Sequence, residues 1–278
     1  MQRESRQKRK SLGDNKKQSY YVDSSIIIIM QRLDRIIEKG GTLEDIYTFL
    51  MHGGRMSESA AKNMYEKYLK LKKGEISFCI TPTVYRETML DAHIKETQDF
   101  VKNYCKLVLP NINSARFAEL VTTVAKELEV VKSKNGHKGL NPSMKEVNGV
   151  QVDDNLEDRL ILAETIAFSI LGRKNLSFID CRRKVSTEIE NGKEVVMIGR
   201  RYKQSQPGLG RDIPMDYAND GVVEIFLHSN HNDFGDRLRD NNDLKQVSAR
   251  LDEILEKVFK GNPKIKVITP NEMEKEGC

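Results

Sequence analysis

The chain has 278 residues, of which 38% are hydrophobic and 31% are charged, with a net charge of +5. This composition can supply a hydrophobic core, which excludes a fully disordered chain. No apolar run reaches the roughly 18 residues of a membrane span, and the N-terminus has no apolar signal segment, so we expect a cytoplasmic protein without a membrane partner.

The excess positive charge lies at the start of the chain. Residues 1–20 contain seven Lys and Arg but only two acidic residues, and the remainder carries 39 basic and 39 acidic residues. We therefore predict a basic disordered tail over 1–18. Such a tail could also attract a phosphate backbone through counterion release. The cysteines at 79, 105, 181 and 278 form no C-x-x-C pair, which favours reduced thiols over a zinc site or disulfides.

Hydrophobic periodicity beyond the tail predicts strands that alternate with helices. A Pro after Thr81 marks the start of a helix that carries Tyr85 and Glu87. The predicted strands cover 20–22, 76–80, 107–109, 176–179, 222–227 and 265–268, and the other predicted helices cover 26–37, 43–51, 57–71, 115–131, 155–171 and 244–259.

Two segments interrupt this alternation. Residues 132–153 are polar and Gly-rich, which predicts a loop, and 185–189 and 195–198 flank Asn191-Gly192, which predicts a β-hairpin. The expected fold is a three-layer α/β/α domain over 19–273 with a mostly parallel central sheet. It would contain a helical insertion at 31–75 and a hairpin and loop insertion at 184–219.

Five acidic residues are placed where such a sheet binds ligands, beyond the carboxyl ends of its strands. Asp23, Asp180 and Asp233 follow predicted strands, Glu87 lies in the helix after a strand, and Asp158 opens a helix. Each has a simpler interpretation on its own, because Asp commonly caps helices and forms turns, and Glu commonly lies on a solvated helix face. Their joint placement is what favours a functional site.

Several carboxylates at one edge would repel each other unless a divalent cation lay among them. Mg²⁺ and Mn²⁺ prefer oxygen ligands of this kind. One or two such ions can activate water and stabilise the leaving oxygen when a phosphodiester is cleaved. The pattern therefore predicts a metal-dependent hydrolase with Mg²⁺ or Mn²⁺ as cofactor.

Three motifs resemble those of the PIN-domain nucleases. Tyr21-Val22-Asp23-Ser24-Ser25-Ile26 resembles the first acidic motif of that family, and Ile80-Thr81-Pro82-Thr83-Val84-Tyr85-Arg86-Glu87 resembles the second. Asp158-Arg159-Leu160-Ile161-Leu162-Ala163 is similar to the third, and the tail from Ile265 to Met273 resembles the closing strand of many members. The resemblance implies a PIN-like fold and a ribonuclease in which Asp23, Glu87 and Asp158 hold the metal, with Ser24 or Ser229 assisting by hydrogen bonds.

The resemblance leaves the fourth acid open. Asp180 lies at the usual distance after the third motif, whereas Phe226 to Phe234 resembles a Thr-Asn-Asn-x-x-Asp-Phe variant found in larger PIN-like proteins and contains Asp233. We favour Asp233 because the residues around it match the variant motif. We retain Asp180 because its distance from the third motif matches the usual spacing. Residues 31–75 are longer than in compact toxin-type members, so the resemblance identifies no antitoxin-like partner.

The sequence allows comparison with three other classes of site or protein. His228, His231 and Asp233 could hold zinc or iron. A phosphatase of the haloacid dehalogenase class is excluded because Ser25 stands where that class needs a second Asp. A non-catalytic PIN-fold scaffold that binds nucleic acid is the main alternative to the enzyme. RNA is the expected partner, DNA is the alternative polymer, and the chain could act as a homodimer.

Overall fold

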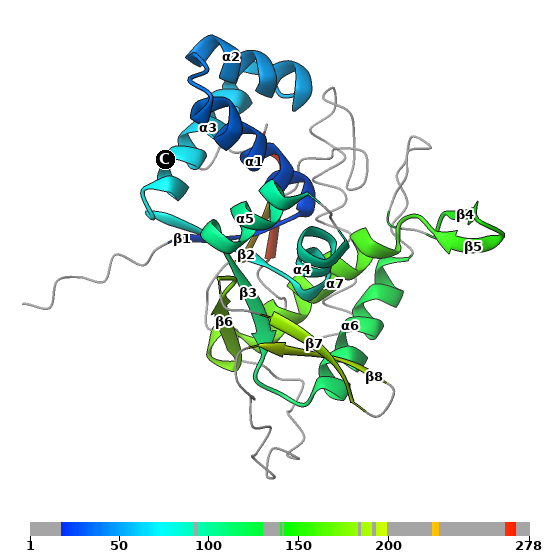
Figure 1. The fold of residues 1–278 in the computed structure, drawn as a ribbon. Coiled ribbons are helices and arrows are strands. Elements are labelled where there is room, and N and C mark those ends of the chain that lie inside the picture. Colours follow the sequence, from blue (N-terminus) through cyan, green and yellow to red (C-terminus); the bar gives the residue numbers. More distant parts are fainter. Residues whose placement is uncertain are drawn as a thin grey trace, which may run out of the picture.

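The central feature of the computed structural model is a six-stranded sheet (Figure 1). The structure describes residues 18–91, 94–129, 140, 142–182, 185–190, 193–198, 224–227 and 265–270. The strands lie in the order β10 (Ile265–Ile268), β9 (Glu224–Leu227), β1 (Gln18–Val22), β2 (Ile76–Ile80), β3 (Cys105–Pro110) and β6 (Leu176–Asp180). The first five are parallel and β6 is antiparallel to β3, so the predicted mostly parallel sheet is confirmed.

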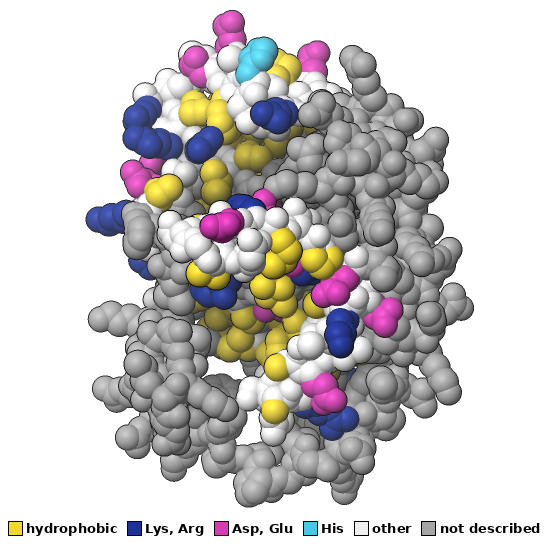
Figure 2. Space-filling model, turned by 90° about the vertical axis from the view of Figure 1, so that its right-hand side faces the viewer, with side chains coloured by type: hydrophobic (Ala, Val, Ile, Leu, Met, Phe, Trp, Pro, Cys, Tyr) yellow, Lys and Arg dark blue, Asp and Glu magenta, His cyan; other side chains and the backbone are white. Residues whose placement is uncertain are grey.

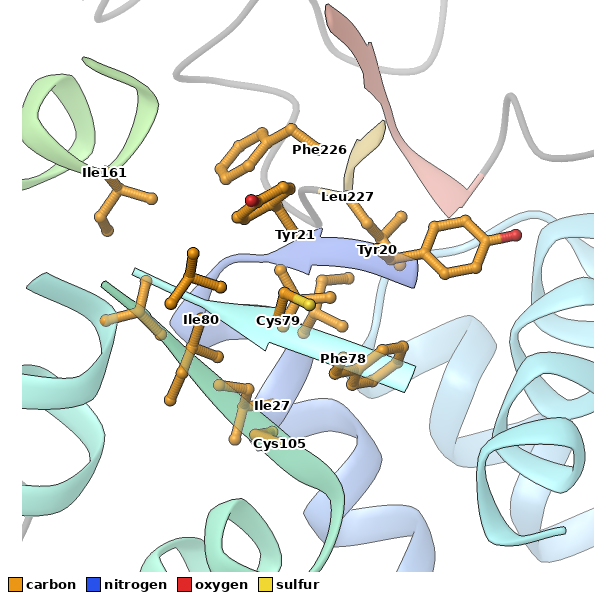
Figure 3. Packing of buried hydrophobic residues seen from close by; sticks show 14 of the residues in the cluster. Tyr20, Tyr21, Ile27, Phe78, Cys79, Ile80, Cys105, Ile161, Phe226 and Leu227 are labelled. Carbon is orange, nitrogen blue, oxygen red and sulfur yellow. The ribbon is translucent and has the colours of Figure 1, made fainter. Parts of the chain in front are cut away.

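Helices cover both faces of this sheet. Tyr20 and Tyr21 are consecutive in β1 and therefore point to opposite faces. The Tyr20 hydroxyl accepts a hydrogen bond of 2.7 Å from Lys67 of α3, whereas the Tyr21 ring stacks on Phe168 of α7 with centroids 5.9 Å apart. Figure 3 shows Tyr21 together with Phe226 of the neighbouring strand β9, to which it is paired in register. The three-layer α/β/α arrangement follows from these contacts.

Most predicted helices are present, and their N-termini are capped by the side chains that precede them. Asp23, Thr42, Ser57, Thr81 and Asn113 each accept a hydrogen bond from the first turn that follows. The α-helices are α1 (Ser24–Glu38), α2 (Leu43–Thr48), α3 (Glu58–Lys72), α4 (Pro82–Tyr85), α5 (Lys95–Tyr104), α6 (Ser114–Leu128) and α7 (Leu156–Leu171), and the others are the π-helices η1 (Phe49–Gly53) and η2 (Arg86–Asp91) and the 3₁₀-helix η3 (Arg173–Asn175).

Helix α5 was not predicted from the sequence. Its N-cap residue Ile94 provides no side-chain hydrogen bond, and its buried side chains are Thr97, Phe100 and Val101. The segment therefore has neither a capping signal nor a long apolar stripe. Contacts with β3 and η2 stabilise the helix. Hydrophobic periodicity in the sequence does not reveal such contacts.

The expectation of a loop over 132–153 is wrong in its second half. Strands β4 (Met144–Val147) and β5 (Val150–Asp153) form an antiparallel hairpin. Its turn consists of Asn148 and Gly149, both with positive φ (53° and 79°), as a two-residue primed turn requires. The hairpin projects from the body in Figure 1. The same Asn-Gly signal at 191–192 predicts a β-hairpin, and β7 (Val185–Glu190) pairs with β8 (Lys193–Ile198) as expected.

The strand at 176–179 is the antiparallel member of this mostly parallel sheet. Two consecutive helices, α6 and α7, separate β3 from β6, so the single-helix crossover that makes neighbouring strands parallel does not apply. Strand β6 therefore runs back along β3, with Leu176 opposite Pro110 and Asp180 opposite Lys106. The predicted helix at 244–259 lies outside the described residues.

Candidate functional site

Asp23 lies at the point where the sheet changes its direction of growth. From β1 the chain adds β2 and β3 on one side, and later adds β9 and β10 on the other. Open α/β sheets bind ligands at such a switch point, beyond the carboxyl ends of the strands. Asp23 follows β1 directly, is only 4% exposed, and its backbone N–H donates to the carbonyl of Leu227 at the end of β9, 3.2 Å away.

The local sequence explains how the Asp23 carboxylate is held. It is the N-cap of α1, and its Oδ2 accepts from the backbone N–H of Ser25 at 3.1 Å and from the Ser25 hydroxyl. Ile26, Ile27 and Met30 bury the first turns of the helix against the core. A capping side chain on a helix anchored in this way has a fixed position.

Glu87 meets Asp23 from the neighbouring strand. It lies in η2, the π-helical turn that continues α4 after β2, and single π-turns often occur at functional sites. Burial raises the pKa of Glu87 to about 7, a hydrogen bond from the Ser24 hydroxyl opposes the rise, and the negative charges of Asp23 and Glu157 add to it. Two acids from separate strands therefore lie within electrostatic reach at the switch point.

This raised pKa leads to a pH-dependent prediction for Glu87→Gln in EDTA. The folded protein binds the Glu87 proton more tightly than the unfolded chain does, so stability falls as the pH rises from 4.5 towards about 7. Glutamine has no charge to desolvate. We expect it to raise the free energy of unfolding by about 1–3 kcal/mol at pH 8 and to change it little at pH 4.

Urea unfolding at the two pH values measures this difference. Glu66→Gln, at an exposed position of α3, is the control and should show no pH-dependent gain. An equal effect of Glu87→Gln at pH 4 and pH 8 would contradict the burial of Glu87, which is the main cause of its raised pKa.

Helix α7 is joined by an ion pair to the segment that carries Glu87. Arg86, next to Glu87, pairs with Glu157 at 2.9 Å. Two turns further along α7, the buried Glu164 accepts from the backbone N–H and the hydroxyl of Thr83 at 3.1 and 2.9 Å. These bonds attach the start of α4 to α7. Asp158 is partly buried in the first turn of α7, adjacent to Glu157.

The donor set fits a hard divalent cation in kind but is not complete. Asp23 and Glu87 offer carboxylate oxygens, which suit Mg²⁺ and Mn²⁺. Within the ranges that the structure describes, no three His, Cys, Asp or Glu side chains are grouped so that they could hold a metal ion. Further ligands would have to come from a reoriented Asp158 or from residues outside these ranges.

The structure separates the two candidates for the fourth acid. Asp180 ends the antiparallel edge strand β6 and is exposed, opposite the second residue of β3 and three strands from β1. At about 4.8 Å per strand this is roughly 14 Å from β1, so Asp180 does not join Asp23 and Glu87. Asp233 and the pair His228 and His231 lie outside the described residues. However, β9 lies beside β1, as the Asp233 alternative requires.

The sequence pattern did not reveal Glu157 and Glu164. Both lie on one face of α7, because seven residues complete two helical turns. Glu164 stands in an otherwise apolar stretch, and a lone acid within a buried helix is a signal that could have found it. By contrast, the hydrogen bond from Ser24 to Glu87 agrees with the supporting role expected of Ser24.

Comparisons with models of known protein families, with curated proteins and with solved structures give no match. Among the described helices, none combines the length and the apolar character needed to cross a membrane.

Proposed function

We propose that the protein is a metal-dependent ribonuclease of the PIN-like class. The observation that carries this proposal is the placement of Asp23 and Glu87 after the neighbouring strands β1 and β2 at the switch point of the parallel sheet. The charge of Asp23 adds to the raised pKa of Glu87, and a bound cation would relieve that repulsion. This arrangement is unfavourable for stability alone, which favours a functional reason for it.

The positions of the resembling motifs support the same proposal. The first motif ends β1, the second ends β2, and the third opens α7, which bonds to the start of α4 through Glu164 and Thr83. Three short motifs that are far apart in the sequence thus belong to adjacent elements. Figure 1 shows α4 and α7 beside each other next to the sheet.

In the proposed mechanism, Asp23, Glu87 and Asp158 would hold Mg²⁺ or Mn²⁺, and Asp233 would complete the set. A bound ion would activate water and neutralise charge on the phosphodiester. Ser25 fixes the Asp23 carboxylate, and Ser24 orients Glu87. Burial raises the pKa of Glu87 to about 7, so its proton would have to leave before its carboxylate could hold a metal ion.

A cleavage assay tests this proposal directly. The full chain is incubated with a 5′-labelled single-stranded RNA in Mn²⁺, in Mg²⁺, and in EDTA. We expect cleavage with the ions, none in EDTA, and recovery when Mn²⁺ is added in excess of the EDTA. Cleavage that persists in EDTA would contradict the role of a metal.

A non-catalytic RNA-binding scaffold is the second candidate. It is favoured by the lack of a three-acid group among the described residues. RNA binding without cleavage in any divalent ion would identify the scaffold and reject the enzyme.

A metal titration of Asp180→Asn and Asp233→Asn is expected to separate the two acids. Asp180 is exposed on the edge strand about three strands from β1, so its variant should keep the wild-type curve. Loss of a ligand at Asp233 should raise the half-saturating Mg²⁺ or Mn²⁺ by at least about 10-fold, as changes around metal ligands commonly do. Wild-type curves for both variants would limit the site to the acids of the first three motifs.

A further inference from the structure

The solvent-facing side of α1 carries a row of basic side chains. Arg32, Arg35 and Lys39 are exposed, and they follow Ser24 and the exposed Ile28 at spacings of four, four, three and four residues. These spacings place all five on one side of a helix. The opposite side, with Ile26, Met30 and Leu33, is buried in the core.

The three basic residues border a pocket with an aromatic wall. Together with Ile36 and Phe49, they line an open pocket of about 300 Å³. Phe49 is the first residue of the π-turn η1 and is partly buried. Figure 2 shows Lys and Arg side chains beside hydrophobic side chains on the upper part of the molecule, where α1, α2 and α3 lie in Figure 1.

The positive charge of this row is not neutralised by the described acids. No ion pair in the described part of the chain involves Arg32, Arg35 or Lys39. Asp34 of the same helix instead accepts from Lys72 at 2.8 Å and from the Tyr68 hydroxyl at 2.5 Å. Glu38 lies four residues after Asp34 and three after Arg35, so it borders the basic row, but no ion pair joins it to Arg35 in the described part of the chain.

We infer that Arg32, Arg35, Lys39 and Phe49, which we call the α1 track, bind single-stranded nucleic acid that leads into the site at Asp23 and Glu87. This inference rests on the proposed function. Arg and Lys bind phosphates, and a base can stack on an aromatic ring such as Phe49. The bases of a single strand are free to stack on an aromatic side chain, whereas those of a duplex are paired and stacked, so a single strand fits this surface better than a duplex.

The direction of α1 connects the track to the candidate site. Ser24, which bonds to Glu87, lies in the first turn, and the row begins there. With a helical rise of 1.5 Å per residue, Arg32 lies about 12 Å and Lys39 about 22 Å from Ser24 along the axis. A strand with one phosphodiester at Asp23 would therefore meet the track within its next few nucleotides.

Binding of a 5′-fluorescein U12 RNA in EDTA tests the track without cleavage. The variants, made in the full chain, are Arg32→Gln/Arg35→Gln/Lys39→Gln and Phe49→Leu. The control variant is Lys62→Gln/Lys70→Gln/Lys73→Gln, which removes the same charge from exposed positions around α3.

Loss of three phosphate contacts should weaken binding at least about 10-fold and reduce the salt slope of log K by about 2, because each contact contributes about 0.7 for single strands. Phe49→Leu should weaken binding about 5-fold or more with an unchanged slope. The control should keep wild-type affinity and slope. Thermal midpoints of the two triple variants should match the wild type, since the replaced cations are exposed. Phe49 packs partly against the core, so the midpoint of Phe49→Leu is measured to show that the variant is folded at the temperature of the binding assay.

Equal losses in the triple variant and in its control, or wild-type binding by the triple variant, would overturn the inference. Competition by poly-glutamate as strong as that by U12 would also overturn it, by indicating an acidic protein partner. The outcome is separable from the proposed function, because binding is measured without metal. A failed cleavage assay combined with track-dependent binding would reject the nuclease alone, and metal-dependent cleavage with track-independent binding would reject the track alone.

Discussion

Asp23→Asn is expected to lower metal-dependent RNA cleavage by more than about 100-fold, because even residues that only surround metal ligands contribute 10- to 100-fold. The asparagine amide is neutral and has one oxygen in place of two, so it is a poor ligand for Mg²⁺ or Mn²⁺. It can still accept the hydrogen bond from Ser25 and cap α1 as well as Asp does. The fold should persist, and the thermal midpoint should rise or stay unchanged because the repulsion with Glu87 is relieved.

Cleavage rates at saturating Mn²⁺, with the thermal midpoint measured in parallel, check this expectation. Glu38→Gln is the matched control, since it removes one negative charge from the exposed last turn of the same helix. Its activity should remain within about 2-fold of the wild type, as surface substitutions rarely do more. Retained activity in Asp23→Asn would remove Asp23 from the site.

The central strands and the first two acids could be predicted because local patterns determine them. β2 is buried from end to end and β1 is buried from Tyr20 to Val22, as expected of strands covered on both faces. Asp23 and Thr81 directly follow these strands and cap the helices after them, so each has a local signal. Parallel neighbours bring such positions to one edge, which is why Asp23 and Glu87 could be expected to meet.

Strand direction at the edge of the sheet could not be predicted in this way. The run Leu176–Asp180 has the same apolar character whether it is parallel or antiparallel. The direction of a strand depends on how many helices come before it and on the edge of the sheet at which the last of these helices ends. Because α6 and α7 both intervene before β6, Asp180 lies away from β1. Spacing along the sequence therefore favoured Asp180, although the strand order places this residue away from the site.

Contacts between helices were also beyond the sequence pattern. Glu164 looks like a misplaced charge in an apolar helix until the backbone N–H of Thr83 is placed beside it, 3.1 Å away. A buried carboxylate is tolerated when its oxygens accept hydrogen bonds. The partner is 81 residues away in the chain, so no local rule could identify it.

The position of β9 beside β1 depends on a second long-range pair. Glu224, the first residue of β9, is only 4% exposed, and both of its oxygens accept from Arg173 of η3, at 2.8 and 2.9 Å. Such two-point pairs between a guanidinium and a carboxylate hold their partners in a defined orientation. Arg173 therefore links the end of α7 to the strand that forms one side of the switch point.

Arg173→Met is expected to lower the free energy of unfolding by about 3 kcal/mol, because removing one partner leaves a buried charge without compensation. Arg173→Met/Glu224→Leu removes both charges, and it should recover most of the loss because apolar replacements of buried pairs are often neutral.

Arg182→Met, which breaks the exposed pair with Asp180, is the control and should change stability by no more than about 1 kcal/mol. Urea unfolding at pH 7 gives the free energies of unfolding of the wild type and of the three variants. A double variant as unstable as Arg173→Met would show that the guanidinium acts through packing on the sheet, not through its charge.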